Sequence, residues 1–345
     1  MRNSSILIGV MLGLFLVPGL LTADDGHAPE GRQYTVIRWS TDLQVGGDIV
    51  AKAGLADELT VTRETDRWLW VPARKAWLHQ QDAVASGDAV GHFNQVVQEE
   101  PSAETFHQRA VFQFRQGEYE SALADLTEAH RRDAKNVAVL NDRGNLLRRL
   151  GKLDVALSDF NEVVRLGAKH PTVFTNRGLV HQAAGDHDRA LSDFNAAVQM
   201  DEQFAPAWEA AGSSRYATGD FPKALQNFRR AVKLDPNFAL AQNNLAWLLA
   251  TCPDKDVRDG EAAVSAAEQA CELTGFAKVR FLDTLAAAHA EAGDFDQAVE
   301  RATQAIELAD QARHPAMQSR LELYKSGQPL RHTPTEDEPA SGSNR

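Results

Sequence analysis

Residues 151–165 read GKLDVALSDFNEVVR, and residues 185–199, which begin 34 positions later, read GDHDRALSDFNAAVQ. An alanine follows the first glycine of each copy by five residues, an aromatic or leucine residue by nine, and another small or branched apolar residue by twelve. Steps of four and three residues fall on one stripe of an α-helix, so each copy predicts a helix with one apolar face. The 34-residue step continues in both directions, through Gly117, Gly151, Gly185 and Gly219.

The recurring small residues predict that this helix packs closely against a second one. Glycine can adopt the left-handed turn that ends the preceding helix, and alanine lets two antiparallel helices approach each other. A close helix crossing also requires small residues on the other helix. The chain supplies them seven positions before each glycine, at Ala110, Gly144, Gly178 and Gly212.

A helical hairpin with a 34-residue period is typical of the tetratricopeptide repeat, and the chain resembles that family over residues 103–312. The resemblance implies a mainly α fold, an α-solenoid that is a right-handed superhelix of helix-turn-helix repeats. Gly293 follows Gly219 by 74 residues, so one repeat is longer by six. A half-repeat helix at 86–101 and a closing helix at 313–326 are expected to cap the array. The expected repeats are 103–136, 137–170, 171–204, 205–238, 239–278 and 279–312.

Residues 34–84 predict a small all-β unit, because short alternating segments are separated by glycine and aspartate. Residues 44–78, QVGGDIVAKAGLADELTVTRETDRWLWVPARKAWL, resemble bacterial SH3-like barrels, with Ala76 and Leu78 in place of that family's glycine and last valine. An aromatic surface can stack on a peptide or a glycan, whereas a small barrel must also fill its core. The candidate ligand contacts of this SH3-like β-barrel are Trp68, Trp70 and Trp77.

The amino terminus predicts export. Arg2 precedes an apolar run over Ile6–Leu21, and Ala23 offers a small residue for cleavage, so residues 1–23 read as a signal peptide followed by a linker at 24–33. An uncleaved anchor is the alternative, although the run is shorter than the roughly 20 residues that cross a bilayer. We therefore expect a periplasmic or cell-envelope protein with no integral membrane span after cleavage.

The remaining composition argues against an enzyme. The net charge of -12 disfavours nucleic acid as a partner, because such binding relies on clustered Lys and Arg. Motifs for phosphate, dinucleotide or zinc binding and for a serine nucleophile are absent, and no segment is left for a catalytic domain. We expect no catalytic residue, no cofactor and no metal site. Residues 327–345 are expected to be a disordered tail.

Two smaller patterns have simple interpretations. Asp125, Asp159 and Asp193 recur at the repeat spacing and are interpreted as a solvated face. Cys252 and Cys271 fall about 16 Å apart at the rise of 1.5 Å per helical residue, too far for a disulfide, and are predicted to be buried and unpaired.

The family resemblance implies that the first helices line a concave groove, where side chains contact a partner. Asparagine both donates and accepts hydrogen bonds and so suits an extended peptide backbone, and Arg148 adds a possible contact to a carboxylate. Polar residues that only hydrate the groove are the alternative. The family's asparagine ladder is matched only at Asn176 and Asn244, and its carboxylate clamp is not matched, because Thr172 and Asn176 stand where basic residues are needed. The groove candidates are His107, Asn141, Asn145, Arg148, Thr175, Asn176, Tyr216, Asn243, Asn244 and Trp247, with Asp142, Gln182 and Glu209 on the same positions of the repeat.

The leading hypothesis is therefore an exported, non-catalytic scaffold that binds a peptide or protein partner in the groove. The alternative is a cell-wall or glycan binding protein that uses the SH3-like module, with the repeats as a spacer. A third hypothesis is an accessory subunit of an envelope enzyme.

Overall fold

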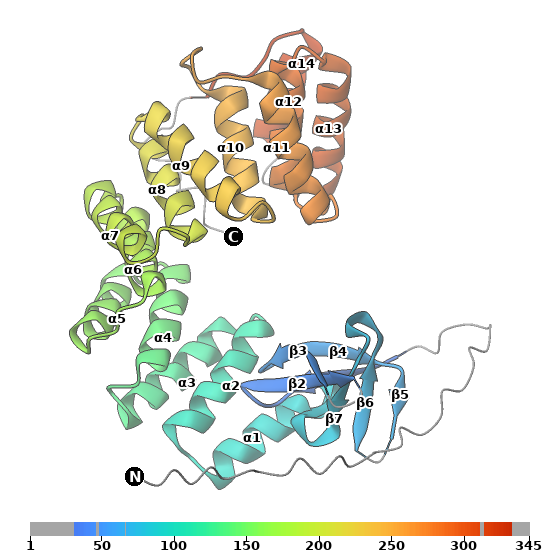
Figure 1. The fold of residues 1–345 in the computed structure, drawn as a ribbon, viewed down its shortest axis with the longest axis vertical. Coiled ribbons are helices and arrows are strands. Elements are labelled where there is room, and N and C mark those ends of the chain that lie inside the picture. The colour runs from blue at the N-terminus through green and yellow to red at the C-terminus, as the bar shows by residue number, and fades with distance from the viewer. Residues whose placement is uncertain (1–30, 46–47, 66, 311–313, 333–345) are drawn as a thin grey trace, which may run out of the picture. The chain divides into compact units, whose positions relative to one another are not determined.

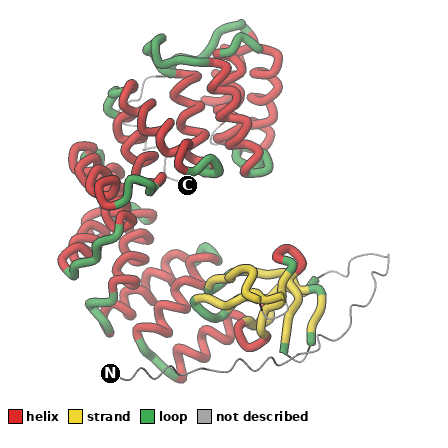
Figure 2. The backbone as a smooth tube through the Cα atoms, in the orientation of Figure 1, coloured by secondary structure: helices red, strands yellow, loops and turns green. Residues whose placement is uncertain are grey.

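The structure is a computed structural model that describes residues 31–45, 48–65, 67–310 and 314–332. The predicted signal peptide and most of the predicted tail lie outside these residues. The described chain divides between Arg132 and Asp133 into two compact units. Strands and the first three α-helices make up the first unit, and the described part of the second is helical (Figures 1 and 2).

The strands of the first unit pair antiparallel in two sheets, one in the order β4-β1-β8 and the other in the order β3-β2-β7-β6-β5. Among the described residues they form small sheets and not the closed barrel that was expected, an arrangement that is still compatible with an SH3-like module. The elements are β1 (Arg32–Val36), β2 (Ser40–Val45), β3 (Asp48–Gly54), β4 (Glu58–Val61), β5 (Arg63–Glu64), β6 (Trp68–Val71), β7 (Ala76–His79) and β8 (Ala83–Ala85), with the 3-10 helices η1 (Pro72–Arg74), η2 (Gln80–Asp82) and η3 (Ser86–Asp88) between or after them.

Aliphatic side chains fill the core of this strand module. Successive residues of a strand point to opposite faces of the sheet. In β6 and β7, Leu69, Val71, Ala76 and Leu78 are the buried members of the alternation, and they join Leu43 in one cluster. The tryptophans therefore occupy the opposite face, and core filling does not depend on them.

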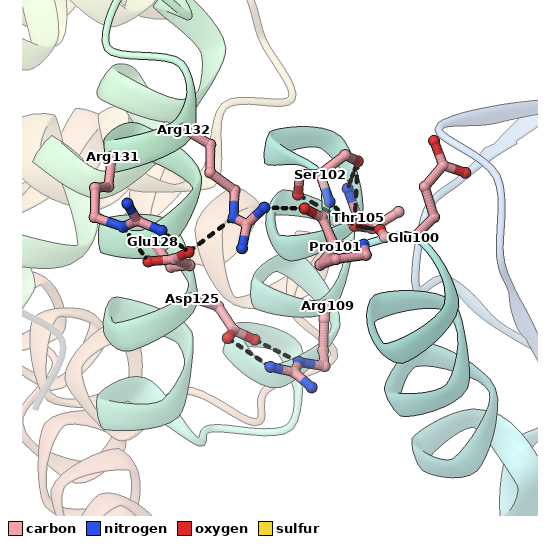
Figure 3. Close-up of polar contacts among 9 residues, drawn as sticks. All are labelled: Glu100, Pro101, Ser102, Thr105, Arg109, Asp125, Glu128, Arg131 and Arg132. Carbon is pink, nitrogen blue, oxygen red and sulfur yellow. Dashed lines mark hydrogen bonds and ion pairs between the residues drawn. The ribbon is translucent and has the colours of Figure 1, made fainter.

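The strand module continues into α1 (Ala89–Glu99), α2 (Ala103–Arg115) and α3 (Tyr119–Arg132). Phe93 of α1 stacks on Phe112 of α2 with the ring centroids 4.8 Å apart, and both are buried with Leu55 and Ala56 from the turn that follows β3. Ser102 starts α2 with a capping box, in which its hydroxyl accepts from the Thr105 amide at 3.2 Å (Figure 3). This satisfies backbone donors that the helix itself leaves unpaired.

The second unit is a series of antiparallel hairpins, each made of a first and a second helix that contact each other along their length (Figure 1). Its final helix, α14, packs on the last hairpin. The helices are α4 (Val137–Arg149), α5 (Leu153–Arg165), α6 (Pro171–Ala183), α7 (His187–Met200), α8 (Ala205–Ala217), α9 (Phe221–Leu234), α10 (Ala239–Thr251), α11 (Gly260–Leu273), α12 (Val279–Glu291), α13 (Phe295–Leu308) and α14 (His314–Lys325).

On the first helices, glycines allow the two helices of a hairpin to pack closely, because they have no side chain. An ideal Cβ placed on Gly178 would lie 2.5 Å from Cε1 of Phe194, and one on Gly144 would lie 2.8 Å from Cε2 of Phe160. Both phenylalanine rings are fully buried, so neither has room to move aside. The turn glycines that the sequence indicated, for example Gly185 with φ +78, are indeed in the left-handed conformation.

The recurring aspartates are buried, and their interpretation as a solvated face was wrong. Asp159 is 3% exposed and receives two hydrogen bonds from Arg143, at 2.8 and 2.6 Å. Asp125 is paired with Arg109 in the same way, as Figure 3 shows, and Asp193 with Arg177. Each pair joins the first and second helix of one hairpin. The signal that sequence reasoning missed is an arginine 16 residues before each aspartate.

Two further observations concern the helical part. Cys252 and Cys271 are both buried, as predicted, and burial raises the pKa of the Cys271 thiol to about 11. In the described ranges, no helix combines the length and the apolar character that crossing a membrane requires.

Replacing Gly178 with alanine tests the close crossing. We expect Gly178→Ala to lower the free energy of unfolding by about 1–3 kcal/mol, because overpacking in a full core outweighs the better helix propensity of alanine. Gly91→Ala in α1 is the control, since a Cβ there meets nothing within 4 Å, and it should be neutral or slightly stabilising. Urea unfolding measures both, and equal stability of the two variants would contradict the packing described.

Candidate partner-binding surface

The first helices of the second unit form one continuous layer. α4 contacts α6, α6 contacts α8, α8 contacts α10 and α10 contacts α12, while α5, α7 and α9 each pack against the following first helix. We call the surface formed by α4, α6, α8, α10 and α12 the first-helix face. It carries most of the residues that the sequence proposed for partner binding.

The α4 end of this face is polar. Asn141, Asn145 and Arg148 are spaced four and three residues apart, so they lie on one stripe of α4, and all three are half-buried. Asn176 of α6 donates from Nδ2 to Oδ1 of Asn141 at 3.0 Å. The structure therefore brings two of the predicted asparagines together across neighbouring repeats.

Arg148 differs from Arg143, which lies on the same helix, in its interactions. Arg143 is paired with Asp159, whereas Arg148 forms no ion pair with any residue that the structure describes, and its buried Nε donates no hydrogen bond there. Burial, followed by the positive charge of Arg149, lowers the pKa of Arg148. A partly desolvated cation without a counter-charge favours an incoming carboxylate.

The middle of the face holds a buried carboxyl group. Glu209 on α8 is 7% exposed, and its Oε1 accepts from Asn244 Nδ2 at 2.7 Å and from Ser213 Oγ at 2.8 Å. Desolvation raises the pKa of Glu209, and the two hydrogen bonds and the charge of Arg280 act in the opposite direction. Asn244 is thus committed to an internal contact.

Helices α8 and α10 also carry an aromatic pair. Trp247 Nε1 donates to the hydroxyl of Tyr216 at 3.0 Å, and both side chains are half-buried. These two candidates, from α10 and α8, are therefore in direct contact.

The remaining groove candidates are buried. In the second unit Thr175 and Asn243 are 4% and 3% exposed, and the Thr175 hydroxyl donates to the Pro171 carbonyl. His107 belongs to the first unit, is 3% exposed, and lies with its ring centroid 4.7 Å from that of Trp39. Repeat position alone did not distinguish these residues from accessible ones, because the depth of each side chain depends on the size of its neighbours.

A second candidate surface lies on the five-stranded sheet of the first unit. Trp70 pairs with Trp77 across β6 and β7, with the ring centroids 5.2 Å apart, and Trp68 pairs with His79 at 5.0 Å. Strand register continues the row of Trp70 and Trp77 to Gln44 on one side and Arg63 on the other. All three tryptophans are half-buried on the side opposite the core, and we call them the outer tryptophan face.

No group of three or more potential metal-ligating side chains is present in the part of the chain that the structure describes.

Glu209 supplies a pH-dependent prediction. Because its pKa is raised in the folded state, its contribution to stability is full below the ordinary Glu pKa and is lost as pH rises through the folded-state pKa. Glu209→Gln keeps an acceptor for Asn244 without the buried charge, so we expect it to be more stable than the natural chain at pH 7, by about 1 kcal/mol.

That advantage should shrink as the pH is lowered toward 4. Urea unfolding at several pH values measures it, with the exposed Glu272→Gln as control. A constant loss of stability at every pH in Glu209→Gln would contradict the prediction.

Comparisons with known proteins agree with the hairpin structure. The family model described as tetratricopeptide repeat matches residues 109–172, 175–237 and 209–274. A search for relatives among curated proteins gives no significant match.

Several solved structures are similar. A chain of the APC/C hetero-tetramer Cut9-Hcn1 is 14% identical with a TM-score of 0.58, and the match covers 66% of this chain and 45% of that one, less than half its length. PilF of Pseudomonas aeruginosa is 16% identical with a TM-score of 0.52, over 63% of this chain and 96% of its own. Yeast Tom70 is 17% identical with a TM-score of 0.52, over 68% of this chain and 49% of its own. At these identities the likeness concerns the fold alone, a tetratricopeptide-like α-solenoid, and it agrees with the match of the tetratricopeptide repeat model within residues 109–274.

Proposed function

We propose that the chain is an exported scaffold that holds an extended segment of a protein partner on the first-helix face of its second unit. Tetratricopeptide repeats bind protein or peptide partners and are generally non-catalytic. The observation that carries the proposal for this chain is the stripe of Asn141, Asn145 and Arg148 on α4, which Asn176 joins from α6.

The chemistry of the stripe suits a peptide backbone with a nearby negative charge. An asparagine side chain offers one acceptor oxygen and two donor hydrogens, so it can pair with both groups of a peptide unit. The guanidinium group of Arg148 can bind a carboxylate through two parallel hydrogen bonds. We therefore propose a partner segment that is extended where it crosses the asparagines and carries an aspartate, a glutamate or a terminal carboxylate at Arg148.

Export is part of the proposal, and the sequence alone supports it. The signal-like residues 1–23 support secretion into the periplasm or envelope. An exported scaffold would bind a partner in that same compartment.

The neighbouring arginines of α4 offer a matched test. The full chain is used for affinity capture from a cross-linked envelope fraction, and binding of the identified partner segment is then measured by calorimetry. We expect Arg148→Ala to weaken binding at least about tenfold, because a hydrogen bond to a charged group contributes about 1.5–3 kcal/mol.

Arg149→Ala removes the same charge from an exposed position one residue away and should change affinity much less. If the two variants bind alike while both stay folded by circular dichroism, the first-helix stripe is not the binding site.

The outer tryptophan face favours a second candidate function, a glycan or cell-wall contact made by the strand module. Rings that stand half-exposed on a sheet can stack on sugar rings. The polar residues Gln44 and Arg63 flank the row and can hydrogen-bond to hydroxyl groups.

Retention on purified cell wall tests this candidate in the full chain. We expect Trp70→Ala with Trp77→Ala to abolish retention, since both halves of the stacked pair are removed. Trp208→Ala, in the second unit, is the control and should be retained like the natural chain. Equal retention of the double variant would exclude the outer tryptophan face as the contact.

A further inference from the structure

The chain returns to the first-helix face after its last helix. α14 is anchored by Tyr324, which is fully buried, and the chain then turns at Gly327, whose φ is +71. The segment Leu330–His332 has no regular secondary structure, and each of its three residues makes a different contact with other residues of the second unit.

The first two contacts are apolar and ionic. Leu330 packs against the hydrophobic core of the last repeats. Arg331 forms an ion pair with Glu291 at 2.6 Å, and Arg258 contacts the other carboxylate oxygen at 2.8 Å. Glu291 thus lies between two cations, one of them supplied by the returning segment.

His332 makes the third contact, with the aromatic pair on α8 and α10 of the first-helix face. Its backbone amide donates to the carbonyl of Thr251 at 2.9 Å, and its Nδ1 lies 2.7 Å from the hydroxyl of Tyr216. The ring stacks on Tyr216, with a centroid separation of 6.3 Å and an angle of 8°, and meets Trp247 edge-on at 5.4 Å. We call Tyr216, Trp247 and the Thr251 carbonyl the histidine pocket.

These contacts have the form of peptide recognition. A backbone hydrogen bond, a ring held against two aromatics, a basic side chain at a carboxylate and an apolar anchor come from three consecutive residues of an irregular segment. The segment is partly accessible, because Arg331 is exposed and Leu330 and His332 are only half-buried. Gly327 separates it from α14, whose packing rests on the buried Tyr324 and not on the segment.

We propose that the histidine pocket is a peptide-binding site whose resident ligand is the chain's own segment Leu330–His332. An incoming segment with an apolar residue, a basic residue and a histidine in sequence competes for the same groups. The further step, that a partner bound along the first-helix face displaces this segment, rests on the proposed function. Binding of the segment Leu330–His332 in the histidine pocket does not rest on the proposed function.

The test uses the full chain and a labelled, end-blocked peptide of residues 326–332, Ser-Gly-Gln-Pro-Leu-Arg-His. Arg331→Ala with His332→Ala in the chain empties the pocket, and neither residue is in the buried core. We expect the peptide to bind this variant with a Kd below about 1 mM, because a resident segment must bind more tightly than its effective concentration on a short linker. The natural chain should bind it at least about tenfold more weakly.

Two controls define the site. Trp247→Ala added to the double variant should abolish peptide binding, and a peptide with alanine in place of His332 should bind about tenfold more weakly. A chain that ends at Ser326 provides a second emptied form if the double variant is poorly folded. Equal peptide binding to the natural and emptied chains, or none below about 1 mM to a folded emptied chain, would overturn the proposal.

The result of the peptide experiment does not depend on the partner proposed for the stripe on α4. Arg148→Ala should leave peptide binding unchanged, because Arg148 lies on α4 and the pocket is formed by α8 and α10. Failure of the peptide to bind would therefore leave the proposed stripe on α4 intact, and failure of the stripe would leave the histidine pocket intact.

Discussion

In the hairpins α4–α5, α6–α7 and α8–α9 a phenylalanine of the second helix lies against a glycine of the first, where no side chain fits: Phe160 on Gly144, Phe194 on Gly178 and Phe228 on Gly212. This contact sets the separation of the two helices, and the buried pairs Arg143–Asp159 and Arg177–Asp193 fix their register in two of these hairpins. Losing one member of such a pair typically costs about 3–5 kcal/mol. Because each hairpin is held internally in this way, residues on the side of the first helix that faces away from the second helix are not needed for this contact.

Different parts of the first-helix face carry different kinds of residue. On α4 and α6 it presents amides and an arginine that has no counter-charge among the described residues, and on α8 and α10 it presents an aromatic pair in contact with His332. On α8 and α10, Glu209, Ser213 and Asn244 form hydrogen bonds with one another and are buried. The face therefore carries a polar stripe on α4 and α6, and on α8 and α10 both a buried hydrogen-bond network and the histidine pocket.

Much of the helical fold could be predicted from sequence, because a 34-residue step in glycine, alanine and phenylalanine depends only on local geometry. The candidate surface could be predicted only in part. Repeat position placed Asn141, Asn176, Tyr216 and Trp247 on the first helices, but whether a side chain is reachable depends on its neighbours, and Thr175 and Asn243 are buried.

Two other features depend on contacts that sequence spacing does not show. The aspartates looked solvated because aspartate usually is, and their arginine partners stand on another helix. The contact between Tyr216 and His332 joins residues 116 positions apart, in a segment whose composition suggested a tail. The alternation of the tryptophans with buried aliphatic residues, by contrast, was already present in the strands and explains the outer tryptophan face.

Site-specific photo-crosslinking tests most directly whether the first-helix face holds the partner. A photoreactive residue is placed at Asn145, on the stripe of α4, or at Ser158, which is exposed on the second helix α5 of the same repeat. The proposed function predicts an adduct at position 145 with one defined segment of the partner, lost when Arg148 is also changed to alanine, and no adduct with that segment at position 158. An adduct with the same segment at position 158 and none at position 145 would contradict it.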